Sequence, residues 1–189
     1  MESRRGSLLV FALVMSVASV LAIRPTARAE EPGAGAAPED TLLSVARELI
    51  GATRFCALVT LDESCGPRVR TMDPFPPEDD MVLWLGTNRN SRKVQDIRRD
   101  PRVALHYMHP EGRGYVSVYG TARLVDDPGE KETRWKEAWA RYYPDNRAAY
   151  LLIAVTPERI ELIDYVRGIG GDSESWIPAS VDFGGNTRD

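Results

Sequence analysis

The chain has 189 residues, of which 43% are apolar and 28% charged, an ordinary balance for one globular domain with a short additional segment. A chain of this length can bury roughly 70% of its unfolded surface, so folding does not require a metal or a disulfide. A formal net charge of −4 argues against nucleic acid as a partner, because nucleic-acid-binding domains are usually strongly basic.

The first 29 residues are expected to be a signal peptide. Arg4 and Arg5 precede an apolar run at residues 8–23, which is shorter than the roughly 20 apolar residues of a comfortable membrane span. The segment ends in a small-x-small pattern at Ala27 and Ala29, so we expect cleavage after Ala29. An uncleaved anchor is the alternative.

The leader also bears on the route of export. Its Ser-Arg-Arg start resembles a twin-arginine signal, whereas Ser7 stands where that motif prefers Phe, so a Sec signal is the alternative. Either route predicts an exported bacterial protein, periplasmic or secreted, without stable membrane association after cleavage. The leader carries a net charge of +3, so the remaining 160 residues carry −4 − 3 = −7.

Residues 30–39 are rich in Pro, Gly and small residues, which indicates a linker. The domain is expected at residues 40–183, with a tail at 184–189. Its first element is a helix, which Asp40 or Thr41 can cap and Gly51 can end.

Most of the domain is predicted to form strands, because runs of alternating or continuous apolar residues are separated by turn residues. The predicted strands are 55–61, 67–72, 81–87, 103–108, 115–125, 151–155 and 159–165. The last two are expected to be separate strands around the segment Thr156-Pro157-Glu158. Short strands with few helices favour a barrel over a doubly wound sheet, so the predicted fold is mainly β with about six barrel strands.

Two further helices are predicted between the strands. The first begins at Ser91 and runs to about Arg99. The second has Asp127 as its cap and Pro128 at its first position, and is expected to carry Trp135 and Trp139 on one face.

A cluster of basic residues opens the first of these helices. A strand ends at Thr87, Ser91 is the expected cap, and Arg92 and Lys93 occupy the first turn. The free N–H groups and the dipole of a helix start favour an anion, so cations placed there suit a bound phosphate monoester. Solvated surface cations are the alternative for this motif taken alone.

The run WLGTNRNSRKVQDIRRDPRVALHY at residues 84–107 resembles the flavin segment of pyridoxamine 5′-phosphate oxidases and their general-stress-protein relatives. The similarity extends from Phe55 to Tyr165. The resemblance implies a split β-barrel that binds flavin mononucleotide (FMN) at the two-fold interface of a homodimer. It also implies an FMN-dependent oxidoreductase.

The resemblance assigns nine residues to the cofactor. Those implied to bind the FMN phosphate are Arg70, Ser91, Arg92 and Lys93. Those implied to lie near the ring or the ribityl chain are Thr71, Met72, Thr87, Tyr115 and Trp176. Tyr115 replaces a Gln of the oxidases, and Trp176 belongs to the C-terminal segment GDSESWIP. No catalytic residue is assigned, because the redox chemistry belongs to the flavin.

Two departures from the family pattern bear on the substrate. Phe75 stands where the oxidases have a Lys that holds the substrate phosphate, and the C-terminal Arg-x-His motif is absent. We therefore expect a small-molecule substrate or electron-transfer partner other than pyridoxamine phosphate. The alternative is a non-catalytic binding protein for FMN or another anionic cofactor, such as a deazaflavin or a tetrapyrrole.

The remaining candidate residues are expected to be structural. Cys56 lies early in a strand and Cys65 in the following turn, too far apart for a disulfide. His106 and His109 are three residues apart and are a poor metal pair, because they point to opposite sides of a strand; no metal site is predicted. An aromatic group is expected in core or dimer packing: Trp135, Trp139, Tyr142 and Tyr143.

Overall fold

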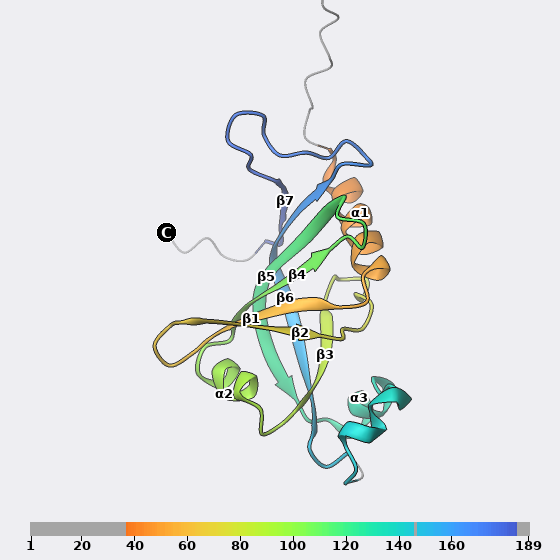
Figure 1. Cartoon of the computed structure of the whole chain (residues 1–189), viewed down its shortest axis with the longest axis vertical. Coiled ribbons are helices and arrows are strands. Elements are labelled where there is room, and N and C mark those ends of the chain that lie inside the picture. The colour runs from red at the N-terminus through yellow and green to blue at the C-terminus, as the bar shows by residue number, and fades with distance from the viewer. Residues whose placement is uncertain (1–36, 146, 185–189) are drawn as a thin grey trace, which may run out of the picture. The chain divides into compact units, whose positions relative to one another are not determined.

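The computed structural model describes residues 37–145 and 147–184 (Figure 1). The helices are α1 (Glu39–Ala52), α2 (Arg92–Arg99), α3 (Pro128–Thr133) and the 3₁₀ helix η1 (Glu137–Tyr142). The strands are β1 (Cys56–Leu61), β2 (Pro67–Met72), β3 (Leu83–Asn88), β4 (Arg102–Met108), β5 (Gly114–Val125), β6 (Tyr150–Asp164) and β7 (Ala179–Asp182). The predicted signal peptide, most of the predicted linker and nearly all of the predicted tail lie outside the described residues.

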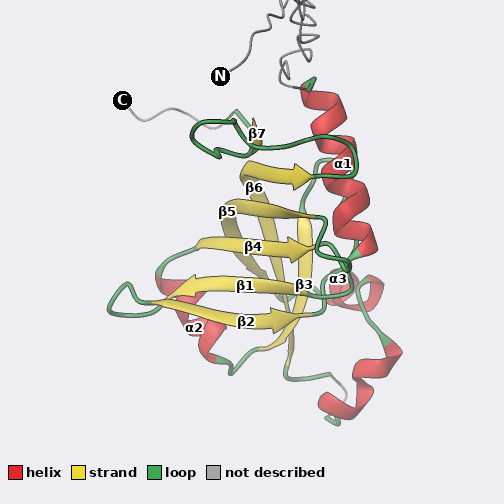
Figure 2. Cartoon of the chain, turned by 45° about the horizontal axis from the view of Figure 1, so that its top comes forward, coloured by secondary structure: helices red, strands yellow, loops and turns green. Residues whose placement is uncertain are grey.

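The strands of the described residues form one antiparallel sheet in the order β2-β1-β4-β5-β6-β3, with β7 also paired to β6 (Figure 2). The two ends of this order meet over a short seam beyond β2. There Pro74 forms an isolated bridge with Leu85 of β3, and the N–H of Phe75 donates to the carbonyl of Trp84 at 2.9 Å. The prediction of a mainly β fold with about six barrel strands is confirmed.

Strand β6 corrects the prediction of two separate C-terminal strands. It runs unbroken from Tyr150 to Asp164 and pairs with β5 from Leu152 to Asp164. The register shifts between Tyr119 and Gly120 of β5, and this irregularity accommodates the Thr-Pro-Glu segment that reads as a turn in the sequence. The first part of β6 pairs with β3 and the later part with β7. Strand β7 has no counterpart in the predicted elements.

The helices differ from the predictions at their ends. Helix α1 begins at Glu39, before both predicted caps, and Pro38 precedes it without a side-chain capping bond. Asp127 does cap α3, accepting a hydrogen bond from the N–H of Glu130 at 2.9 Å. That helix ends at Thr133, so the prediction that it carries both tryptophans is wrong.

Tertiary packing explains the early end of α3. Trp135 packs edge-on against Tyr143 and Tyr150, with ring centroids 5.8 Å and 5.2 Å away. Trp139 lies in η1 and packs edge-on against Phe75 at 5.5 Å. Such packing overrides helix propensity, which is a weak preference. Core packing is thus confirmed for most of the aromatic group, whereas the side chain of Tyr142 is 60% exposed.

The main core lies between α1 and the inner face of the sheet. One face of α1 supplies Leu42, Val45, Ala46, Leu49 and Ile50. Alternate residues of the strands meet them, among which Leu58, Leu105, Val116 and Ile160 are fully buried. The apolar periodicity seen in the sequence therefore corresponds to burial on one side of each strand. Within residues 37–145 and 147–184, no helix is long and apolar enough to cross a membrane.

Both cysteines are free thiols, as the sequence predicts: Cys56 is buried and Cys65 is exposed. Burial raises the pKa of the Cys56 thiol to about 12. Because the thiolate is the reactive form, we expect a disulfide reagent at neutral pH to titrate one thiol in the folded protein and a second only in denaturant. A Cys65→Ser variant should remove the fast reaction. Two fast thiols in the folded wild-type protein would contradict the assignment of Cys56 as the buried, unreactive thiol.

Candidate functional site

The turn between β3 and α2 positions three polar side chains. Thr87 is 3% exposed near the end of β3, and Ser91 occupies the N-cap position of α2, as predicted. The Ser91 side chain makes no capping bond; its Oγ lies 3.2 Å from Oγ1 of Thr87. Lys93 Nζ donates to the same Thr87 oxygen at 3.1 Å.

Lys93 carries a charge that its surroundings do not neutralise. Burial lowers the pKa of its ammonium group, and the charge of Arg70 lowers that pKa further. Within the described part of the chain, no carboxylate pairs with Lys93 or with the exposed Arg92. Burial and neighbouring cations destabilise the charged form of a lysine side chain. A bound anion would reverse that effect.

Arg70 extends this cationic cluster from β2. Its NH1 donates to Thr60 Oγ1 at 2.7 Å and to the carbonyl of Arg68 at 3.0 Å. Its NH2 lies 3.4 Å from Oδ2 of Asp96. Burial lowers the pKa of this guanidinium, and Asp96 opposes the shift. A guanidinium has five N–H groups, and the Nε–H of Arg70 has no partner among the residues described.

Asp96 is the residue of this site that sequence reasoning missed. It is 1% exposed, and its carboxylate contacts Thr60 at 2.8 Å, Arg68 at 3.0 Å, Arg99 at 3.2 Å and Arg70 at 3.4 Å. The available signal was a single acid in the basic helix RKVQDIRR, immediately before the apolar Ile97.

Two residues predicted to lie near the flavin ring, Thr71 and Met72, do not share one face of the sheet. Thr71 and Met72 are neighbours in β2, so they point to opposite faces of the sheet; Thr71 is exposed and Met72 buried. Because β2 ends the strand order, a ligand along its free edge would meet backbone groups of both residues.

Two predicted site residues lie apart from the cationic cluster within one chain. Tyr115 is on β5, separated from β2 by β1 and β4, where its ring packs 5.3 Å from the ring of His106. Trp176 is 75% exposed and belongs to the loop between β6 and β7. Figure 1 shows that loop at the end of the domain opposite α2. The structure thus brings together Arg70, Thr87, Ser91, Arg92 and Lys93.

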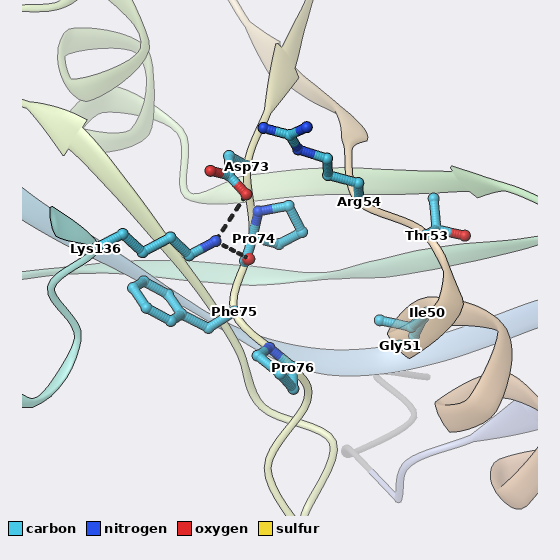
Figure 3. Close-up of a pocket in the computed structure, with 9 residues that line it drawn as sticks. All are labelled: Ile50, Gly51, Thr53, Arg54, Asp73, Pro74, Phe75, Pro76 and Lys136. Carbon is cyan, nitrogen blue, oxygen red and sulfur yellow. Dashed lines mark hydrogen bonds and ion pairs between the residues drawn. The ribbon is translucent and has the colours of Figure 1, made fainter. Parts of the chain in front are cut away.

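A cavity of about 190 Å³ lies directly beyond Met72, between residues 73–76 and the end of α1 with the residues that follow it. Figure 3 shows Lys136 reaching over Phe75 to this segment. Lys136 Nζ donates to Asp73 Oδ1 and to the carbonyl of Pro74, both at 2.7 Å. Trp139 Nε1 donates to the other Asp73 oxygen at 3.1 Å. Each oxygen of the Asp73 carboxylate therefore has a partner within the chain.

The two histidines have local partners. His106 Nδ1 lies 2.9 Å from Ser117 Oγ, and His109 follows β4 and accepts a hydrogen bond from the N–H of Glu111 at 3.1 Å. The described residues contain no group of three or more His, Cys, Asp or Glu side chains arranged to hold a metal ion.

The fold is a β-barrel that places Arg70, Arg92 and Lys93 together, and within the described residues Arg92 and Lys93 have no carboxylate partner. Residues 42–164 match the family model of pyridoxamine 5′-phosphate oxidase, and the chain belongs to this family. The split-barrel fold that the resemblance implied is therefore confirmed.

Solved structures with this fold have different functional names. General Stress Protein 26 from Bacillus anthracis str. Sterne is 25% identical, with a TM-score of 0.61 over 75% of this chain and 98% of that chain. A heme binding protein from Mycobacterium smegmatis is 16% identical, with a TM-score of 0.52 over 62% and 52%. An F420 reductase is 22% identical, with a TM-score of 0.51 over 60% and 94%. No curated protein matches the chain.

Proposed function

We propose that this protein is an exported FMN-binding oxidoreductase that acts on a substrate other than pyridoxamine phosphate. The observation that carries the proposal is the partly buried ammonium of Lys93, which shares Thr87 with Ser91 and has no carboxylate partner in the described chain. An uncompensated cation in such a place is costly unless a ligand supplies the opposite charge.

A phosphate monoester fits the donors of this site. Ser91 offers a hydroxyl, Arg92 and Arg70 offer guanidinium groups, and Lys93 offers a point charge; charge-assisted hydrogen bonds from such groups are short and strong. The start of α2 adds its own N–H groups and dipole. These residues would hold FMN by its phosphate, and the bound flavin would supply redox chemistry.

A homodimer is part of the proposal, and one face of the sheet supports it. We call the outer face a patch of ten residues on adjoining parts of β2, β1, β4 and β5, bordered by the exposed Arg102 of β4 and Arg123 of β5: Ala57, Val59, Val69, Thr71, Ala104, His106, Met108, Tyr115, Ser117 and Tyr119. It contains no Lys, Arg, Asp or Glu, and Val69 and Met108 are 66% and 54% exposed. Depletion of charge is typical of the core of a protein interface. A second copy on this face would approach β2, and with it the cofactor.

The cavity beyond β2 supports the exclusion of pyridoxamine phosphate. An ammonium group does lie near the position where the oxidases have their Lys, because Lys136 Nζ is 4.8 Å from the ring centroid of Phe75. That ammonium forms an ion pair with Asp73, however, so it is not free to bind a substrate phosphate.

Non-catalytic binding of another anionic cofactor remains the second candidate function, because structures of this fold include a heme binding protein and an F420 reductase. A tetrapyrrole and a deazaflavin also carry anionic groups that the cations of α2 could contact. The absorbance spectrum distinguishes the candidates.

The test is to express the whole chain in a bacterium and recover it from the periplasm. We expect a yellow protein of twice the chain mass, with flavin absorbance bands that dithionite bleaches and air restores. Mass spectrometry of the released cofactor should give FMN. A colourless protein or a Soret band would contradict the FMN assignment, and recovery in the cytoplasm alone would contradict export.

A further inference from the structure

The carboxylate of Asp96 joins the two elements that carry the cationic cluster. Asp96 belongs to α2, the helix that begins with Arg92 and Lys93, and it contacts Arg68 and Arg70 of β2. Thr60 of β1 completes the connection, because its Oγ1 donates to Asp96 at 2.8 Å and accepts from Arg70 NH1 at 2.7 Å. One buried acid therefore sets how a strand and a helix present their cations together.

The hydrogen bonds of Arg70 show which part of its guanidinium is constrained. NH1 and one side of NH2 are occupied by Thr60, the Arg68 carbonyl and Asp96. The Nε–H has no partner among the described residues. A planar guanidinium held by some of its donors keeps the others in a fixed direction, which favours binding of a phosphate oxygen by the remaining donors.

We propose that Asp96 is a positioning residue that orients Arg70 toward the phosphate of the ligand and so gives the site its preference for phosphorylated over unphosphorylated flavin. The inference rests on the proposed function. It specifies which buried group makes the cationic cluster selective.

A second effect of Asp96 acts in the opposite direction. Its negative charge reduces the positive field of the cluster, so its removal would strengthen phosphate binding if the total charge alone mattered. The geometry favours orientation, because Asp96 contacts three arginines at 3.0–3.4 Å and its loss leaves their side chains free to adopt other rotamers. Whether replacing Asp96 lowers or raises the affinity for FMN therefore decides between the two effects.

The experiment compares FMN with riboflavin, which lacks the phosphate, using quenching of flavin fluorescence by apoprotein. In the Asp96→Asn variant we expect FMN affinity to fall by about ten-fold or more, the scale of one charge-assisted hydrogen bond, with riboflavin affinity unchanged. A merely structural loss would weaken both ligands equally. An unchanged or increased preference for FMN would overturn the inference.

Two further variants keep the test decisive. In an Arg70→Gln background, Asp96→Asn should cause no additional loss of FMN preference, because a residue that acts through another shows no independent effect. An additional full loss would overturn the inference. Thr60→Val removes the Thr60 hydrogen bonds to Arg70 NH1 and to Asp96 without removing a charge. It should lower the preference several-fold even if Asp96→Asn fails to fold; an unchanged preference would count against the role of Asp96.

The same data separate this inference from the proposed function. If the wild-type protein binds FMN no better than riboflavin, the phosphate site itself is wrong. If the wild-type protein prefers FMN and Asp96→Asn retains that preference, only the role of Asp96 is wrong.

Discussion

The Arg92→Ala/Lys93→Ala double variant is expected to lose FMN, with a dissociation constant raised by about 10²- to 10⁴-fold. Each charge-assisted hydrogen bond to a phosphate contributes on the order of 1.5–3 kcal/mol, so two contribute about 3–6 kcal/mol. Lys93 is half-buried and Arg92 exposed, so the larger share is expected from Lys93. Equilibrium dialysis of the apoprotein against FMN would measure the change.

A matched control removes the same charge elsewhere. Arg98 is exposed in the last turn of α2, and Arg123 is exposed on β5, so an Arg98→Ala/Arg123→Ala variant has the same net charge as the test variant. We expect it to bind FMN within about three-fold of wild type, because exposed charges at a distance are screened by salt. Retention of FMN by the Arg92/Lys93 variant, or equal losses in both variants, would refute a specific phosphate site.

Replacement of Gly120 by Ala is expected to give the largest loss of stability among single small substitutions. A Cβ at this position would lie 2.1 Å from the carbonyl oxygen of Thr156 and 3.1 Å from Cα of Pro157. These are backbone atoms of β6, which cannot rotate away as a side-chain tip can. Overpacking of this kind costs about 3 kcal/mol, which corresponds to a fall in Tm of roughly 6–12 °C for a domain of this size.

Gly51 provides the control for that substitution. It lies in α1, and a Cβ there would meet no atom within 4 Å. Gly51→Ala should leave Tm unchanged or raise it, because Ala is favoured over Gly in a helix by up to about 1 kcal/mol. Thermal unfolding followed by circular dichroism would measure both variants. A Tm for Gly120→Ala within 2 °C of wild type would show that the β5–β6 bulge can rearrange.

The sequence was informative wherever one residue pattern corresponds to one local structure. Alternating or continuous apolar runs predicted the bounds of β1 to β5 to within one or two residues, because burial of one or both faces of a strand produces such runs. The cap at Asp127 and the helix start at Ser91 were predicted from residue type and spacing. The cationic cluster was recognisable because basic residues at a helix start oppose the helix dipole.

The features missed in the sequence depend on distant partners. Pro157 reads as a turn residue, yet the bulge opposite Gly120 keeps it within β6. The end of α3 depends on aromatic residues that pack around Tyr150. Asp96 looked like one charge in a polar helix, and only the fold shows that it meets arginines of β2. Tyr115 and Trp176 lie apart from the cationic cluster within one chain, and no local pattern predicts whether a second copy of the chain would bring them to it.

The pairing of β3 has a consequence for the order in which the site can form. Strand β3, which ends in the turn leading to α2, has its ladder with the first part of β6, about sixty residues later in the chain. During synthesis, Thr87 and the cations that follow it cannot be held in place until residues 150–155 have been made. Binding of the proposed cofactor would therefore be a late event, dependent on a nearly complete chain.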